Sequence, residues 1–233
     1  MQIKNNAVFI ADSHFNFQRK TLYRILEDIQ NGKIECSQLF LMGDIFDFLA
    51  GEVTYFVEQN QKAIELIQDI SKKIEVYYLE GNHDYNLKKL FPDATVIARQ
   101  EQPFRMNIDT RNVDLAHGDI FVGDGYDRYC KVIRNKYLLM FLNLFDRSAW
   151  ITKIIEKKLA QKQICNKIGD FKYIVQKRIN SFKGDIVLEG HYHEGKSYTF
   201  GKRKYINIPS LACSNEYIQF HNAEFIWKKY EKL

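Results

Sequence analysis

Features that divide or cross-link a chain are scarce in this sequence, and long hydrophobic runs are absent. Only 3 prolines and 12 glycines occur among the 233 residues, and neither a low-complexity tract nor a flexible linker interrupts them. No run of ~20 apolar residues exists that could form a membrane-spanning helix. Hydrophobic residues make up 45% of the chain, which is enough for a full core. We therefore expect one domain over residues 1–233, with one insertion.

Cysteines with the spacing of a disulfide framework or of a thiolate metal site are also missing. The four cysteines, Cys36, Cys130, Cys165 and Cys213, are scattered along the chain, and a reducing cytosol fits that pattern best. Residues 1–11 lead into a strand-like segment, without the basic region and long apolar stretch of a secretion signal. Both observations predict a cytoplasmic protein.

The positive charge of the protein is concentrated in one segment. The formal net charge is +5, yet residues 124–183 alone hold 14 Lys or Arg and 5 Asp or Glu, a net of +9, which leaves about −4 for the rest. From residue 125 to about residue 182 the chain also has a helical pattern and is dense in Leu, Ile and Phe. We therefore expect a basic helical insertion at approximately residues 124–183.

Short apolar runs alternate with amphipathic helices in the first third of the chain. Residues 7–11, 39–42 and 76–79 have the runs typical of buried strands. Apolar residues recur at helical spacing in residues 22–29 and 63–70. This β-α-β-α-β order predicts an α/β architecture.

Strand patterns return on both sides of the basic insertion. Residues 95–116 have a strand-like pattern, and a turn at residues 109–112 is expected to close a hairpin. After the insertion, residues 186–188 form another short apolar run. The later Tyr-, Phe- and Ile-rich segments are broken at Gly201 and Asn222, which indicates closing hairpins.

Polar segments follow five of these strands directly. Because the carboxyl ends of strands line the ligand crevice of an open α/β sheet, we expect their side chains to converge. Five of the six histidines lie in these segments. Imidazole and carboxylate ligands without thiolates suit Mn, Fe or Zn, and their number fits two ions. The segments are Asp12-Ser13-His14, Gly43-Asp44-Ile45-Phe46-Asp47, Gly81-Asn82-His83-Asp84, His117-Gly118-Asp119 and Gly190-His191-Tyr192-His193.

As an ordered set, D-x-H, G-D-x-x-D, G-N-H-D, H-G-D and G-H-x-H resemble the calcineurin-like metallophosphoesterase family. The resemblance implies a four-layer α/β/β/α sandwich with a helical lid insertion, and the activity of a phosphoester or pyrophosphate hydrolase. Two divalent ions, most simply Mn with Fe or Zn as alternatives, would leave about +2 beside two carboxylates to attract a phosphate. By the same resemblance Asp12, His14 and His193 hold one ion, Asn82, His117 and His191 hold the other, and Asp44 bridges them.

Residues next to the implied ligands take further roles in the family. The resemblance implies that His83 hydrogen-bonds the phosphate or protonates the leaving oxygen, and we expect Asp84 to orient its ring. Asp47 and Asp119 are expected to orient a ligand histidine or its loop. Taken singly, each of these residues also has an ordinary interpretation as a turn, cap or loop residue.

The insertion bears on the substrate. Residues 137–145 form an apolar run that is too short to cross a bilayer. The run contains many more apolar residues than an exposed helix usually has. An apolar stripe with a basic border suits a lid that binds acyl chains or lies on an anionic membrane. Packing of this run on the body, or a nucleic-acid surface, are the alternatives. The basic border comprises Arg128, Lys131, Arg134, Lys136, Arg147, Lys153, Lys157 and Lys158.

Within the family, the chain length, the insertion and the Tyr- and Arg-rich entry after residue 119 resemble particular members. Those members cleave UDP-2,3-diacylglucosamine to UMP and acylated glucosamine 1-phosphate in lipid A synthesis. The best known of them carry arginine where His83 stands. The resemblance implies an acylated sugar-nucleotide substrate and peripheral contact with the cytoplasmic face of the inner membrane, and it disfavours nucleic acid. Candidate substrate contacts are Tyr126, Arg128, Tyr129 and Arg134.

Two rival functions differ in testable ways. A soluble phosphodiesterase or phosphatase acting on nucleotides or other phosphoesters would use the same centre, with the insertion serving only as packing. A catalytically silent binding module would keep the fold without turnover. All seven implied ligand positions and His83 are present, which disfavours the silent module.

Overall fold

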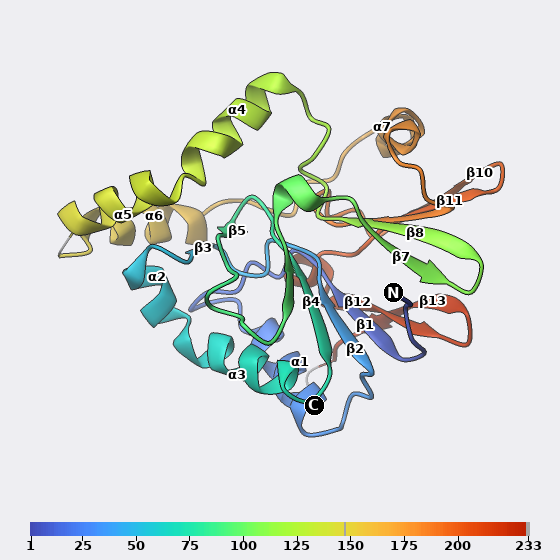
Figure 1. The fold of residues 1–233 in the computed structure, drawn as a ribbon, viewed down its shortest axis with the longest axis horizontal. Helices are drawn as coiled ribbons and strands as arrows, with labels where there is room; N and C mark the ends of the chain where they lie inside the picture. Colours follow the sequence, from blue (N-terminus) through green and yellow to red (C-terminus); the bar gives the residue numbers. More distant parts are fainter. Residues whose placement is uncertain (147, 232–233) are drawn as a thin grey trace.

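Two β-sheets packed face to face form the centre of the computed structural model, which describes residues 1–146 and 148–231. The first sheet has the order β13-β12-β1-β2-β4-β6, the second has the order β10-β11-β9-β8-β7, and β3 pairs with β5 beside them (Figure 1). Strands of the first sheet are β1 (Ala7–Ile10), β2 (Gln38–Leu41), β4 (Glu75–Leu79), β6 (Thr95–Ile97), β12 (Glu216–His221) and β13 (Glu224–Lys229). The others are β7 (Phe104–Ile108), β8 (Arg111–Ala116), β9 (Ile186–Glu189), β10 (Ser197–Phe200), β11 (Arg203–Asn207), β3 (Leu49–Ala50) and β5 (Asp84–Tyr85).

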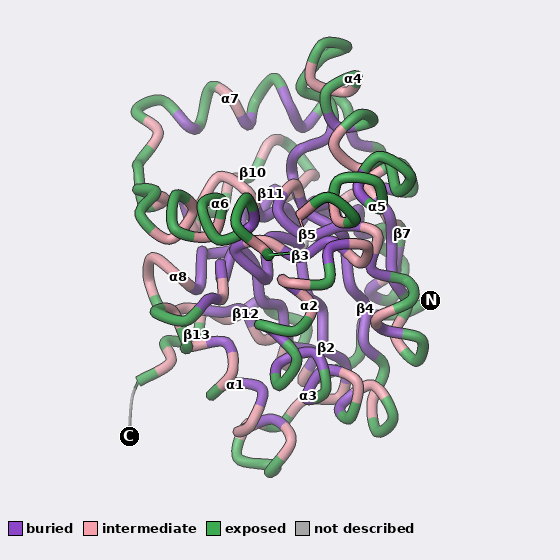
Figure 2. Tube along the Cα trace, turned by 90° about the vertical axis from the view of Figure 1, so that its left-hand side faces the viewer, coloured by how far each residue is buried: buried purple, intermediate pink, exposed green. Residues whose placement is uncertain are grey.

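Helices cover the outer face of each sheet. Helices α1 (Thr21–Gln30) and α3 (Gln61–Ser71) pack on the first sheet, and α7 (Phe171–Arg178) packs on the second. Separate apolar cores fill the spaces between α1, α3 and the first sheet, between the two sheets, and between the second sheet and α7. Figure 2 shows the buried residues gathered between these layers. The predicted α/β/β/α sandwich is therefore confirmed.

Successive side chains of the central strands point to opposite faces of the first sheet, and both faces are buried. In β4, Val76 and Tyr78 point into the core under the helices, whereas Tyr77 and Leu79 point into the core between the sheets. Strands β1 and β2 alternate in the same way, as expected for side chains that project to opposite faces. An apolar run without polar positions is what a sheet covered on both faces requires.

Parallel pairing brings the polar segments to one edge. Strands β1, β2, β4 and β6 run parallel, and so do β8, β9 and β11. Helix α1 makes the crossover from β1 to β2, while α2 (Thr54–Gln59) and α3 lie between β2 and β4. The carboxyl ends of β1, β2 and β4 therefore lie side by side.

Four α-helices lie in the described part of the chain between β8 and β9. They are α4 (Asp124–Ile133), α5 (Lys136–Phe145), α6 (Trp150–Ala160) and α7. The chain leaves the body along α4, passes through α5 and α6 beside α2, and returns to α7 above the second sheet (Figure 1). Among the described residues, no helix has the length and apolar character needed to span a bilayer. Whether residues 124–183 form an insertion in a single domain stays a prediction.

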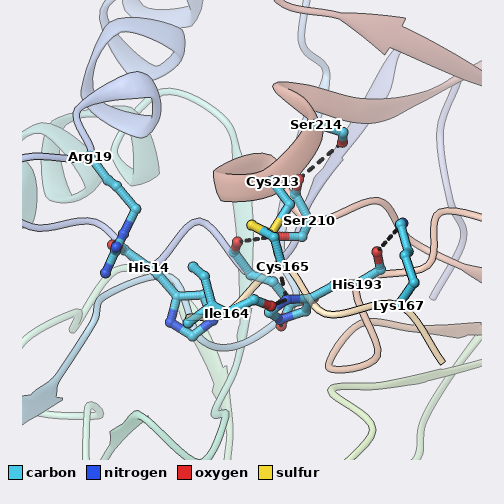
Figure 3. The surroundings of a disulfide bond; sticks show 10 residues. His14, Arg19, Ile164, Cys165, Lys167, His193, Ser210, Cys213 and Ser214 are labelled. Atoms are coloured by element: carbon cyan, nitrogen blue, oxygen red, sulfur yellow. Dashed lines mark hydrogen bonds and ion pairs between the residues drawn. A yellow bond between two sulfur atoms is a disulfide. The ribbon is translucent and has the colours of Figure 1, made fainter. Parts of the chain in front are cut away.

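The expectation that the cysteines form no disulfide is wrong. Cys165, in the segment between α6 and α7, is bonded to Cys213 in α8 (Leu211–Ser214), with the two Cα atoms 5.5 Å apart (Figure 3). The two residues are separated by 48 positions in the sequence. Only the return of the chain from α6 brings them together, so local spacing could not reveal the pair. The cysteine pattern therefore no longer supports a reducing cytosol.

Candidate metal centre

The ends of five strands bring the seven predicted ligands together. Residues 12 and 14 follow β1, residue 44 follows β2, residue 82 follows β4, residue 117 follows β8, and residues 191 and 193 follow β9. Three groups of His and Asp side chains have ligand atoms that all lie within 4.8 Å of one another: Asp12, His14 and His193; Asp44, His117 and His191; and His14, Asp44 and His83. We call Asp12, His14 and His193 the Asp12 site, and His117, His191 and Asn82 the Asn82 site, with Asp44 between them.

Short distances link the members of each site. His193 Nε2 lies 3.3 Å from Asp12 Oδ1. In the Asn82 site, His117 Nε2 lies 3.2 Å from Asn82 Oδ1 and 3.5 Å from Asp44 Oδ1. Each set of atoms is therefore compact enough to share one cation.

Unpaired polar atoms and close glycines fit the bound ions that the family implies. Asp12 Oδ1 and both ring nitrogens of His14 are buried and have no hydrogen-bond partner within the described chain. Buried polar atoms are nearly always paired, so these unpaired atoms beside one another suit a site for a cation. A Cβ added at Gly43 would meet the His117 ring, and one added at Gly81 would meet the Asp44 carboxylate. Only glycine leaves room for those side chains there.

The backbone is held in an unusual conformation at the proposed ligands. Five of them have positive φ angles: Asp12 (49°), His14 (41°), Asp44 (51°), His191 (65°) and His193 (57°). Non-glycine residues adopt this left-handed region in only ~a few per cent of cases. Such conformations cluster at functional sites, because the surrounding structure must hold them in place. The strand ends are therefore shaped to direct these side chains.

Charge interactions keep both carboxylates ionised. Burial opposes the charged form of Asp12, but His193 lowers the pKa of Asp12 below its ordinary value. Burial likewise opposes charge on Asp44, and His117 holds the pKa of Asp44 well below that value. Burial also disfavours a protonated His191, and with the nearby His117 it lowers the pKa of His191 to about 4. The site thus offers negative carboxylates and a neutral imidazole to cations.

Backbone carbonyls orient two of the histidines. His117 Nδ1 lies 3.0 Å from the Met42 carbonyl, and His193 Nδ1 lies 2.8 Å from the Ile164 carbonyl (Figure 3). A carbonyl oxygen only accepts hydrogen bonds, so Nδ1 carries the proton in each ring. Nε2 is then the atom that would bind an ion after giving up its proton, which is the usual arrangement for a metal-binding histidine.

Asp47 lies against His14, a proposed ligand of the Asp12 site. Its Oδ1 is 3.5 Å from His14 Nδ1 and 2.7 Å from Arg19 Nη2. Asn16 Nδ2 donates to its Oδ2 at 2.9 Å. Asp119 accepts from Arg99 Nε at 2.8 Å and so braces its own loop.

The prediction that Asp84 orients the ring of His83 is wrong. His83 Nδ1 donates instead to the Asp47 carbonyl at 2.6 Å. The Asp84 carboxylate accepts four hydrogen bonds from elsewhere, from the backbone amides of Asp44, Ile45 and Gly81 and from the Tyr78 hydroxyl. Asp84 therefore ties the loop after β2 to the loop after β4. The ring of His83 still lies at the centre, in a group with His14 and Asp44.

The four candidate substrate contacts occupy different surroundings. Arg128 and Tyr129 are exposed on α4, and Tyr126 is half-buried with the Arg99 guanidinium over its ring. Arg134 is largely buried, and its Nη2 donates to the Gly81 carbonyl at 2.6 Å. Arg134 therefore differs from the other three candidates, because its guanidinium is already hydrogen-bonded within the protein.

Several supporting residues were not predicted from the sequence. Gln102 Oε1 accepts from the His117 amide at 2.7 Å. The Asn207 side chain donates to the carbonyls of Glu189 and Gly190 and accepts from the Glu194 amide at 2.8 Å. In the sequence, Asn207 could have been noticed as a polar residue at the end of an apolar strand. Arg178 has a similar signal, since it lies on the apolar side of α7.

Comparisons with known proteins identify the family of the chain. A family model described as calcineurin-like phosphoesterase matches residues 6–203. The match covers most of the chain, so the chain belongs to the calcineurin-like phosphoesterase family. It is accordingly a hydrolase of the metal-dependent phosphoesterase class.

More specific relatives carry one shared name. The chain is 27% identical over 199 residues to a UDP-2,3-diacylglucosamine hydrolase of Histophilus somni, covering 80% of this chain and 83% of the relative. A UDP-2,3-diacylglucosamine hydrolase of Wigglesworthia glossinidia brevipalpis is 23% identical over 240 residues, covering 98% and 95%. Among solved structures, an archaeal phosphodiesterase matches with a TM-score of 0.48 at 12% identity, covering 96% of this chain and 98% of that chain.

Proposed function

We propose that this protein is a two-metal hydrolase that cleaves the pyrophosphate of UDP-2,3-diacylglucosamine to UMP and acylated glucosamine 1-phosphate in lipid A synthesis. The observation that carries the two-metal proposal is the convergence of seven polar side chains into two compact sites that share Asp44. The substrate proposal is supported by the names of the relatives, which cover nearly the whole chain in one case.

The proposed centre assigns a separate task to each group of residues. Two divalent ions, with Mn as the first choice, would lower the pKa of a water molecule and would supply positive charge for the phosphate. Residues of the Asp12 site and the Asn82 site would hold them, together with Asp44. His83 lies beside both Asp44 and His14, where it can hydrogen-bond the phosphate or give a proton to the leaving oxygen.

A cavity with aromatic side chains in its wall lies beside the centre, and it supports the proposal that the substrate has an apolar part. It has a volume of about 720 Å³, within the range of small-molecule sites. Phe15, Phe48, Phe56 and Leu159 supply apolar walls beside polar lining residues such as Glu58, and Asp47 connects the cavity to the Asp12 site. Its wall includes both the body and α6, so residues 124–183 would act as a lid over bound acyl chains. Tyr126, Arg128 and Tyr129 remain the proposed contacts for polar groups of the substrate.

The outer surface of the insertion supports peripheral membrane contact. Side chains of α5 and α6 leave large apolar groups in solvent, with Phe145 70% and Trp150 67% exposed. Lys153, Lys157 and Lys158 lie on the same helix as Trp150. Apolar side chains with a basic border suit the anionic cytoplasmic face of the inner membrane, which we propose as the location.

Turnover after metal exchange tests the metal chemistry. The protein is freed of metal with a chelator, and hydrolysis of UDP-2,3-diacylglucosamine is followed with and without added Mn. We expect activity only with the ion, and a loss of at least ~100-fold in His117→Ala. His221→Ala is the matched control, because His221 lies in β12 outside both sites. Full metal content and full activity in His117→Ala would refute the proposed centre.

A substrate panel separates the rival functions. UDP-2,3-diacylglucosamine is compared with nucleotide phosphodiesters and phosphomonoesters under the same metal conditions. Preference for the small esters would replace the lipid proposal with a soluble phosphodiesterase or phosphatase. No turnover of any phosphoester by the metal-loaded protein would favour a silent binding module.

Membrane contact is tested on the exposed residues of α5 and α6. We expect the double substitution of Phe145 and Trp150 by serine to weaken binding to phosphatidylglycerol vesicles, because it removes apolar surface. Tyr173→Ser is a matched control, since Tyr173 is an exposed aromatic residue on α7. Equal vesicle binding by all three proteins would contradict the proposed contact.

A further inference from the structure

Two arginines of the segment between β8 and β9, one buried and one largely buried, bond to loops that carry the Asn82 site. Arg178, at the end of α7, is buried and pairs with Glu189, which is fully buried in β9. The Arg178 Nε and Nη2 atoms lie 2.8 and 2.7 Å from the two Glu189 carboxylate oxygens. Nη2 also lies 2.8 Å from the carbonyls of both Gly118 and Ile120. One guanidinium therefore joins the loop after His117 to the strand that ends just before His191.

Arg134, which follows α4, makes a corresponding contact with the loop after β4, which carries Asn82. Its Nη2 donates to the Gly81 carbonyl at 2.6 Å, directly before Asn82. Its Nη1 lies 3.5 Å from Glu80 Oε2, and Nη2 lies 3.4 Å from Asp119 Oδ2. Arg134 thus joins the loop of Asn82 to the loop of His117.

The contacts of the two arginines support the Asn82 site and not the Asp12 site. Asn82, His117 and His191 each lie within two residues of a group bonded by Arg134 or Arg178. The Asp12 site has other supports. The Ile164 carbonyl accepts from His193 (Figure 3). Asp47 faces His14, and the Ser210 hydroxyl donates to the Asp12 carbonyl.

We propose that Arg134 and Arg178 are positioning residues that set the affinity of the Asn82 site for its ion. The segment between β8 and β9 would then contribute to metal binding through these two side chains. The proposal rests on the two-metal centre proposed above and does not depend on the identity of the substrate.

Arginine is required at these positions for geometric reasons. Its planar guanidinium has donors in a fixed fork and can bond a carboxylate and carbonyls together, whereas the ammonium of lysine is a compact point charge. Groups that orient metal ligands typically change metal affinity by ~10- to 100-fold when they are replaced. Lysine would keep the positive charge beside Glu189 but lose the simultaneous bonds to the carbonyls of Gly118 and Ile120.

The test measures metal binding by the whole protein, without any substrate. Metal-free wild type, Arg134→Lys and Arg178→Lys are titrated with Mn, and the affinities for the first and second ion are measured by calorimetry. We expect the second ion to bind at least ~10-fold more weakly in both variants, with the first affinity unchanged. Lys172→Met, which removes an exposed cation from α7, is the matched control and should bind both ions normally.

A paired variant separates positioning from simple folding. Arg178→Met leaves Glu189 buried without its cation, so this variant can lose stability for that reason alone. Arg178→Met combined with Glu189→Met removes both charges. We expect the combined variant to fold, as judged by its melting temperature, and still to bind the second ion weakly because the two carbonyls have lost their donor.

Two results would overturn the proposal. One is equal weakening of both ions in the lysine variants, which would indicate general loosening of the fold. The other is normal binding of the second ion by the combined variant. If wild type bound no second ion at all, the two-metal function itself would fail, which is distinguishable from either result because it concerns the unaltered protein.

Discussion

Asp84 is predicted to hold the metal loops together, and Asp84→Asn tests that role. The carboxylate is fully buried and accepts hydrogen bonds from Asp44 N at 3.0 Å, Gly81 N at 2.8 Å, Ile45 N at 2.6 Å and the Tyr78 hydroxyl at 2.7 Å. An asparagine amide has one oxygen, so it can accept at only one side of this cluster. Its NH2 group would face donors at the other side.

The expected change in the free energy of unfolding follows from the hydrogen bonds that Asp84→Asn loses and from the charge that it removes. Two bonds to a charged acceptor are lost, at ~1.5–3 kcal/mol each. Against this, burial and the neighbouring Asp44 raise the pKa of Asp84, so removing its charge offsets part of the loss. We expect the free energy of unfolding to fall by about 2–4 kcal/mol, which a domain with ~5–15 kcal/mol of stability can survive.

The assay combines urea unfolding of the metal-free protein with Mn titration, and Asp114→Asn is the matched control. Asp114 is equally buried and also accepts four hydrogen bonds, from Arg105 and from the amides of Lys183 and Gly184. None of those donors belongs to a proposed ligand loop. We expect similar destabilisation in both variants but weaker metal binding only in Asp84→Asn. Unchanged metal affinity in a folded Asp84→Asn protein would refute the reasoning.

Three further predictions concern the cross-link, the tether of the insertion and the support of His14. Replacing Cys165 and Cys213 by serine should lower the unfolding free energy by ~2–4 kcal/mol, and a dithiol reductant should lower the melting temperature of wild type but not of this variant. Tyr55→Phe removes the 2.8 Å bond from Tyr55 to Glu156 of α6, so limited proteolysis within α6 should become up to ~5-fold faster for a loss of about 1 kcal/mol, with Mn affinity unchanged; an unaltered cleavage rate would argue against the tether. Asp47→Ala should weaken Mn binding at the Asp12 site by ~10-fold or more, whereas Asp69→Ala, at an exposed carboxylate on α3, should not.

Local patterns in the sequence determined the strands, the helices and the positions of the polar segments. The apolar runs of β1, β2 and β4 are contiguous, and the residues that end them follow directly in the chain. The order of the polar segments along the chain also determined the family, which the match over residues 6–203 confirms. This information lies in neighbouring residues and in their order, so no knowledge of packing is needed to use it.

Packing alone decided which distant residues support the centre. The Cys165–Cys213 bond, the pairing of Arg178 with Glu189, and the partners of Asp84 all join segments that the sequence separates. Each of these contacts depends on ångström-scale distances between atoms of different elements, and residue type and spacing carry no such distances. The same physical reason explains why Asp84 was given the wrong partner, since its nearest neighbour in the chain, His83, points its ring toward Asp47 in the folded protein.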